Sequence, residues 1–184
     1  RDRKVYLFDK DSSTPLWTYT AGAFVRDVSI SADGEYVVAG SDDKKVYLFG
    51  KDSSTPLWSY ETGDDVRSVS ISANGEYIAA GSWDDKVYLF DKDSSTPLWN
   101  YTTGDRVDSV SLSADGRYIA AGSWDKNVYL FLNDYGPPPP TATIDSITPS
   151  PARFDAEVTF NGSGSDSDGT VVAYEWYSSI DGFL

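Results

Sequence analysis

Lys45-Val-Tyr-Leu-Phe49 belongs to a set of four nearly identical segments, each beginning 41 residues after the one before. The other members of the set are Lys4–Phe8, Lys86–Phe90 and Asn127–Phe131. Two further blocks, Asp52-Ser-Ser-Thr-Pro-Leu-Trp58 and Ser72-Ala-Asn-Gly75, recur at the same spacing. A constant spacing shared by several blocks is the sequence signature of a repeat architecture. Agreement this close between units also implies recent duplication.

One repeat predicts four short strands and no helix. In the second repeat these strands are expected at Leu57–Tyr60, Val66–Ser72, Tyr77–Ala80 and Val87–Phe90. Apolar and polar residues alternate in the first two, and no stretch has the 3.6-residue apolar period of a helix. Asn74-Gly75 and its copies predict tight hairpins in which both central residues accept a positive φ. Four strands in about 40 residues are typical of a β-propeller blade.

The predicted fold class is therefore all-β, with four-stranded antiparallel propeller blades spanning residues 1–135. The predicted blades lie at about 16–50, 57–91 and 98–132, and residues 4–9 form an orphan strand whose partners are expected upstream. A closed propeller has about four to eight blades, so this segment predicts an incomplete ring. Closing it needs either upstream blades or a second copy of the chain.

Composition excludes several classes of site. The chain has neither Cys nor His, which removes thiolate chemistry, the commonest metal ligand and the commonest general base. The net charge of −14 disfavours binding to nucleic acid, which requires a basic surface. The sequence has no apolar run of about 18 residues, the length that would predict a membrane span. We therefore predict no catalytic residue, no metal site and no cofactor.

The segment Val107–Phe131, which holds Gly122-Ser-Trp-Asp125, resembles a WD repeat. The resemblance implies a structural role for the Asp after the Gly-Ser turn, and the matching residues are Asp43, Asp84 and Asp125, with Asp2 in the first, partial copy. Two features depart from that family. The Trp-Asp ending is replaced by Phe8-Asp9 and its copies, and the Gly-His pair is absent, so the hydrogen-bonded network through that His cannot form.

The segment Val5–Trp17 is similar to the propellers related to pyrroloquinoline-quinone (PQQ) enzymes. In that family a Trp closes each blade and docks against the neighbouring blade. The resemblance implies this packing role for Trp17, Trp58 and Trp99. Their strict periodicity favours packing over a planar cofactor, since one cofactor needs only one site.

A proline linker, Gly136–Pro140, separates the repeats from a second domain at 141–184. Strands are expected there at 141–147, 157–160 and 171–177. Residues 158–176 look like the first half of a polycystic-kidney-disease (PKD) domain, which implies a truncated immunoglobulin-like β-sandwich with Trp176 in its core. Such modules beside propellers are typical of microbial surface proteins, which implies an extracellular or cell-surface location. Asn100 and Asn161 lie in glycosylation sequons compatible with this location.

Asp166–Gly169 has a calcium-loop character, but the twelfth position of such a loop is Tyr177 rather than Glu. The favoured interpretation is a turn between strands.

The repeats differ mainly in two connections, which open on the same face of a propeller. Binding residues tend to lie on loops over a rigid scaffold, so we predict a face that contacts a protein or a glycan. Its candidate residues are Phe24, Arg26, Asp64, Asp65, Arg67, Trp83, Asp105, Arg106 and Trp124. Trp83 and Trp124 would be its aromatic platforms. The alternative is neutral drift at exposed positions.

Three functions are compatible with these features. The favoured one is a non-catalytic surface protein whose propeller is an interaction or structural module, with the PKD-like domain as a spacer or adhesion unit. The alternatives are a quinoprotein-like enzyme with its active site in other blades, and a carbohydrate-binding adhesin.

Overall fold

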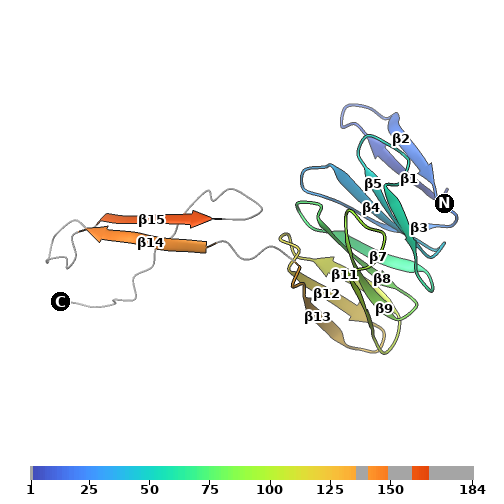
Figure 1. Ribbon diagram of the computed structural model, residues 1–184. Helices are drawn as coiled ribbons and strands as arrows, with labels where there is room; N and C mark the ends of the chain where they lie inside the picture. The colour runs from blue at the N-terminus through green and yellow to red at the C-terminus, as the bar shows by residue number, and fades with distance from the viewer. Residues whose placement is uncertain (1, 136–140, 149–158, 166–184) are drawn as a thin grey trace. The chain divides into compact units, whose positions relative to one another are not determined.

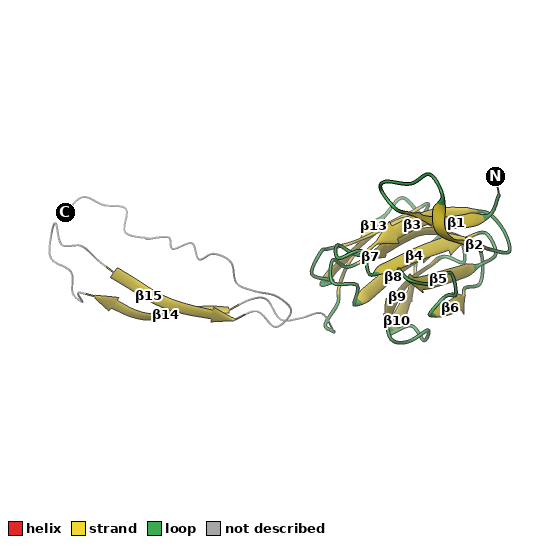
Figure 2. Ribbon diagram, turned by 90° about the horizontal axis from the view of Figure 1, so that it is seen from above, coloured by secondary structure: helices red, strands yellow, loops and turns green. Residues whose placement is uncertain are grey.

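The computed structural model describes residues 2–135, 141–148 and 159–165 of a chain that divides into two compact units, Arg1–Gly136 and Pro137–Leu184. Every regular element in these residues is a β-strand, as the colouring of Figure 2 shows. The all-β prediction is confirmed for these residues. Within the same ranges, no helix has the length and apolar character needed to cross a membrane.

The strands of the first unit are short and rich in β-branched and aromatic residues, which suit a pleated surface. They are β1 (Lys4–Phe8), β2 (Pro15–Thr20), β3 (Val25–Ile30), β4 (Tyr36–Ser41), β5 (Lys45–Gly50), β6 (Trp58–Glu61), β7 (Val66–Ile71), β8 (Tyr77–Ser82), β9 (Lys86–Asp91), β10 (Trp99–Thr102), β11 (Val107–Leu112), β12 (Tyr118–Ser123) and β13 (Val128–Leu132). They form four antiparallel sheets (Figure 1). We name these the first sheet (β1–β2), the second (β3–β6), the third (β7–β10) and the fourth (β11–β13).

The sheets are offset from the predicted blades at 16–50, 57–91 and 98–132. Each predicted blade begins with a strand that belongs to the preceding sheet. Trp58 of β6, for example, pairs with Leu48 of β5. The physical reason is that a short connection returns an antiparallel strand beside its immediate predecessor. A repeat period alone does not say where one sheet ends and the next begins.

The same rule corrects the predicted orphan strand at 4–9. Its residues form β1, which pairs along its length with β2, from Lys4↔Thr20 to Phe8↔Pro15. The strand therefore has a partner downstream in the sequence.

The turns between the first and second strands of the second, third and fourth sheets also differ from the prediction. Only the glycine has a positive φ, 76° at Gly75, while Asn74 does not. Instead, Asn74 Oδ1 accepts hydrogen bonds from Ser72 Oγ at 2.8 Å and from the backbone N–H of Glu76 at 3.1 Å. A side chain that bonds to nearby backbone stabilises the turn, so a second positive φ is not required.

The core lies between neighbouring sheets. Strand β3 contacts β7, and β7 contacts β11. Between the third and fourth sheets, Val87 and Leu89 pack against Val107, Val110 and Ile119. The other face of β9, which carries Tyr88 and Phe90, packs toward the second sheet. Because both faces of a sheet are buried, the central strands are apolar on both sides.

The outer faces of this stack are open. Val28 of β3 is 54% exposed, whereas Val69, at the same repeat position, is 4% exposed. At the other end Val128 is 83% exposed, whereas its equivalent Val87 is fully buried. The described sheets thus form an open arc of blades, consistent with the predicted incomplete ring.

Two strands are described in the second unit, β14 (Thr141–Thr148) and β15 (Thr159–Ser165), and they pair antiparallel. The strand predicted at 141–147 is confirmed, and β15 (Thr159–Ser165) overlaps the one predicted at 157–160 and extends beyond it. The strand predicted at 171–177, Trp176 and the loop Asp166–Gly169 lie outside the described residues.

Candidate functional site

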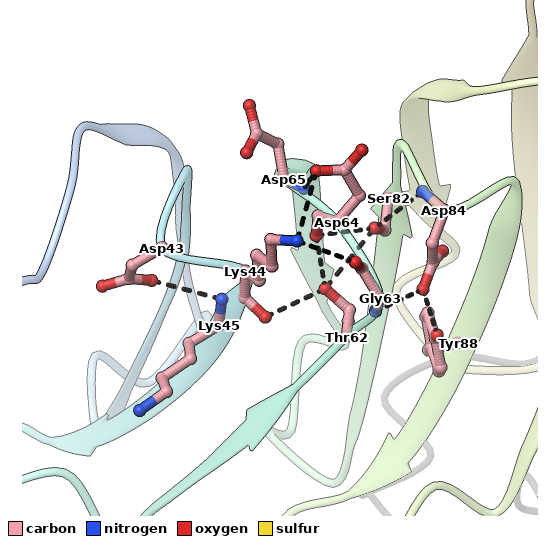
Figure 3. Close-up of polar contacts among 10 residues, drawn as sticks. All are labelled: Asp43, Lys44, Lys45, Thr62, Gly63, Asp64, Asp65, Ser82, Asp84 and Tyr88. Carbon is pink, nitrogen blue, oxygen red and sulfur yellow. Dashed lines mark hydrogen bonds and ion pairs between the residues drawn. The ribbon is translucent and has the colours of Figure 1, made fainter.

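An aspartate anchors the connection that enters each of the second, third and fourth sheets, as Figure 3 shows for Asp84. Its Oδ2 accepts hydrogen bonds from the backbone N–H of Gly63 at 2.7 Å and from the hydroxyl of Tyr88 at 2.5 Å. Its Oδ1 accepts from the backbone N–H of Lys86 at 3.1 Å. Gly63 must lack a side chain, because an added Cβ would lie 2.9 Å from Asp84 Cβ. Asp43 and Asp125 make the same set of contacts.

The tyrosine hydroxyl is a partner that sequence reasoning missed. Tyr47, Tyr88 and Tyr129 each follow the aspartate by four residues, which was the available signal. Burial, reinforced by the hydrogen bond to Asp84, raises the pKa of Tyr88 well above its usual value. The hydrogen bond from Tyr129 lowers the pKa of Asp125 to about 2. The carboxylate of Asp125 is therefore an ionised structural acceptor.

A threonine holds the same connection from the other side (Figure 3). Thr62 Oγ1 lies within hydrogen-bonding distance of two backbone oxygens, 2.9 Å from Lys44 O and 2.6 Å from Asp64 O. Ser82 Oγ donates to Asp64 O at 3.0 Å, and Lys44 Nζ donates to Gly63 O at 3.1 Å. Asp64 thus contributes mainly its backbone. The connection is rigid because its backbone groups are bonded to neighbouring turns.

The tryptophans Trp17, Trp58 and Trp99 lie on the outer strands β2, β6 and β10 and contact the sheet that follows. Trp58 Nε1 donates to Lys92 O at 2.7 Å, and its ring centroid lies 5.3 Å from that of Phe90. The equivalent ring pairs are Trp17–Phe49 at 5.5 Å and Trp99–Phe131 at 5.2 Å. Each indole joins two sheets.

The connections of variable sequence lie together, and we call their surface the variable face. It is defined by Phe24, Arg26, Asp42, Asp65, Arg67, Trp83, Arg106, Asp108 and Trp124. These residues come from three places: the connections before β3, β7 and β11, the first residues of these strands, and the hairpins β4–β5, β8–β9 and β12–β13.

At one end of the variable face, two arginines share one carboxylate. Arg26 donates through Nε to Asp42 Oδ1 at 2.6 Å and through Nη2 to Oδ2. Arg67 Nη1, from the next sheet, lies 3.4 Å from Asp42 Oδ1. The bond from Arg26 lowers the pKa of Asp42, whereas burial and the nearby charge of Asp42 raise that of Asp65. The Arg26 guanidinium lies 5.5 Å from the ring of Phe24.

At the other end, two indoles share one carboxylate. Trp83 Nε1 donates to Asp108 Oδ1 at 2.7 Å, and Trp124 Nε1 donates to Asp108 Oδ2. The two ring centroids are 6.4 Å apart. The guanidinium groups of Arg67 and Arg106 lie 4.3 and 4.6 Å from the centroid of Trp83. Trp83 is half-buried, and the guanidinium groups of Arg67 and Arg106 lie over its ring. Trp124, in contrast, is 55% exposed.

The structure therefore joins most of the candidate residues into one stripe across three sheets. Asp64 and Asp105 lie beside it, and each accepts hydrogen bonds at its backbone oxygen. Asp42 and Asp108 vary between repeats, but only the structure shows that they hold the stripe together. Within residues 2–135, 141–148 and 159–165 no group of three or more acidic side chains is placed to hold a metal ion.

A family model described as WD domain, G-beta repeat matches residues 13–49, 54–91 and 95–131, together more than half of the chain. The matched segments have the same offset as the sequence units, beginning before an outer strand and ending at the third strand of the next sheet. No curated protein matches the chain.

Proposed function

Because this chain belongs to the WD domain, G-beta repeat family, we propose that it is a protein-interaction module and that the variable face binds the partner. The observation that carries the proposal is the contrast between the repeated anchoring residues and the side chains of the variable face. The anchoring Asp, Tyr and Trp residues are the same in each repeat, whereas the side chains of the variable face differ and contact one another across sheets. Loops over a rigid scaffold are where binding residues concentrate.

The exposed ring of Trp124 favours one further candidate, glycan binding. An aromatic face offers a large apolar surface on which the C–H side of a sugar ring can pack, and more than half of Trp124 is accessible. Trp83 is a weaker platform, since guanidinium groups lie over its ring. This limits the glycan candidate to a single exposed indole.

The proposal includes a non-catalytic role and a location outside the cell or on its surface. A lack of Cys and His in the chain supports the first part. The resemblance of residues 158–176 to PKD modules supports the second, with that domain acting as a spacer or adhesion unit. A quinoprotein-like enzyme would instead require a quinone bound by other blades.

Peptide display tests the interaction role. A random peptide library is panned against the immobilised chain, and each enriched peptide is then assayed on three proteins: the native chain, W83A/W124A and L57A. Leu57 is 57% exposed and lies in the connection before β6, away from the variable face, so L57A is the matched control. We expect peptides that bind native protein and L57A but lose binding to the double variant.

Two results would count against the proposal. Peptides bound equally by W83A/W124A would place the interaction elsewhere. A failure to enrich any peptide, together with Trp124-dependent signals on a glycan array, would favour the adhesin instead.

A further inference from the structure

Arg106 differs from the other arginines of the variable face. Arg26 and Arg67 both contact the carboxylate of Asp42. Arg106 is exposed, and no carboxylate of the described residues forms an ion pair with its side chain. Its guanidinium instead lies 4.6 Å from the ring centroid of Trp83 and 5.7 Å from that of Trp124.

The repeat explains how this arises. The position of Asp42 is occupied by Trp83 and Trp124 in the next two repeats, so the carboxylate that pairs with arginine is replaced by an indole. In the third repeat an acidic residue, Asp108, stands at the position that Arg67 has in the second repeat. Its two oxygens accept the indole N–H groups of Trp83 and Trp124. The carboxylate of Asp108 therefore positions the two indole rings that Arg106 contacts.

A guanidinium that contacts aromatic rings through its face keeps its donor edge available. That edge carries N–H groups in a planar fork that matches the two oxygens of a carboxylate. Contact with two rings also reduces the conformational freedom lost when a ligand binds. Beside the fork, the exposed ring of Trp124 offers apolar surface.

We propose that Arg106, Trp83 and Trp124 form a recognition site for a peptide carboxylate, in which an Asp or Glu side chain pairs with Arg106 and an adjacent apolar residue packs on Trp124. This inference rests on the proposed function, because it names the chemistry of the partner at the variable face. The net charge of −14 opposes extended polyanions, whereas one carboxylate needs only short-range contacts.

The test uses three capped peptides of one sequence, Ala-Ala-X-Leu-Ala, in which X is Glu, Gln or phosphoserine. Binding is followed on the native chain by NMR, through the Nε–H signals of the arginines and the indole N–H signals of the tryptophans. We expect the Glu peptide to shift the signals of Arg106 and Trp124, and to bind about tenfold more tightly than the Gln peptide. The phosphoserine arm shows whether phosphate replaces carboxylate.

Two variants distinguish recognition by the guanidinium fork of Arg106 from attraction by its positive charge alone. R106Q should lose the preference for Glu over Gln, and R106K should retain little of it, because lysine has the charge without the fork. K10Q is the control with the same charge change, since the Lys10 side chain is 85% exposed in the β1–β2 connection. An unchanged indole signal of Trp58 shows that each variant is folded.

The outcomes distinguish this inference from the proposed function. Equal binding of Glu and Gln peptides, an unchanged preference in R106Q, or no shift at about 10 mM peptide would overturn carboxylate recognition. Preferential binding of the phosphoserine peptide would overturn it in favour of phosphate. If displayed peptides still need Trp83 and Trp124 in any of these cases, the interaction role stands without it.

Discussion

The hydroxyl of Tyr88 donates a 2.5 Å hydrogen bond to the carboxylate of Asp84, four residues earlier in the same hairpin. Tyr88 is 3% exposed, so its hydroxyl depends on this acceptor. The same carboxylate holds the backbone of Gly63, at the entrance to the sheet. One side-chain pair therefore couples a buried strand to the loop that supports the variable face.

Replacing Tyr88 by Phe should destabilise the fold. The variant removes a donor to a charged group, a loss of about 1.5–3 kcal/mol in the free energy of unfolding. Urea denaturation followed by circular dichroism measures it. Tyr129→Phe, in the half-buried third copy, should cost less. Equal costs at the two positions would contradict the role assigned to burial.

Stability should fall at alkaline pH. Burial, with hydrogen bonds to Asp43 and Asp84, raises the pKa of Tyr47 and of Tyr88 above the ordinary value of 10.0. A raised pKa in the folded state means that these groups contribute full stability below pH 10, and that it is lost progressively as the pH rises beyond that value. Unfolding free energies measured on either side of pH 10, with tyrosinate absorbance as the titration signal, test this. A Y47F/Y88F variant should have a flatter profile, and an unchanged slope would refute the assignment.

Leu89 and Leu130 occupy the same repeat position but should differ in their sensitivity to truncation. Leu89 is fully buried between sheets, whereas Leu130 is 71% exposed on the open face of the fourth sheet. Leu89→Ala should cost about 2–5 kcal/mol, from lost burial and the cavity that remains. Leu130→Ala should stay within about 0.5 kcal/mol of the native chain, as for other surface positions. Similar losses measured by chemical denaturation would show that the face of β13 is covered in solution.

Trp58 should contribute through both its ring and its N–H group. Trp58→Phe keeps an aromatic ring beside Phe90 but removes the 2.7 Å hydrogen bond to Lys92 O. We expect a cost of about 1 kcal/mol for Phe and about 3–5 kcal/mol for Ala. Thermal unfolding of the two variants compares them. If Phe were neutral, the hydrogen bond between sheets would contribute nothing.

The sequence predicted the strands better than the sheets. Alternation and period place β7 and β9 almost to the residue, because these patterns are local. The strand β6 was also predicted, but the predicted blade at 57–91 groups it with the strands that follow it. It pairs instead with β5, because pairing depends on how the connection returns rather than on composition. The turn at Asn74-Gly75 was predicted with two positive φ values, but the side chain of Asn74 satisfies the backbone in another way.

The variable face was predicted as a set of positions, without the contacts between them. Arg67, Trp83 and Arg106 were all candidates, yet the sequence does not reveal that the guanidinium groups lie over the indole. The hydrogen bond from the tyrosine hydroxyl to the anchoring aspartate was not predicted. The constant spacing of the tyrosine after the aspartate was the signal that could have found it.

The sequence by itself determined that this protein is a repeat of short antiparallel strands, because period, alternation and turn residues act within a few residues of one another. Only the tertiary structure decided which strand closes which sheet, which valines are buried, and which arginine lacks an acid. Burial depends on the neighbouring sheet, so identical side chains such as Val28 and Val69 have different surroundings. Burial arises between sheets and strand pairing arises from how each connection returns, so residue identity alone does not specify them.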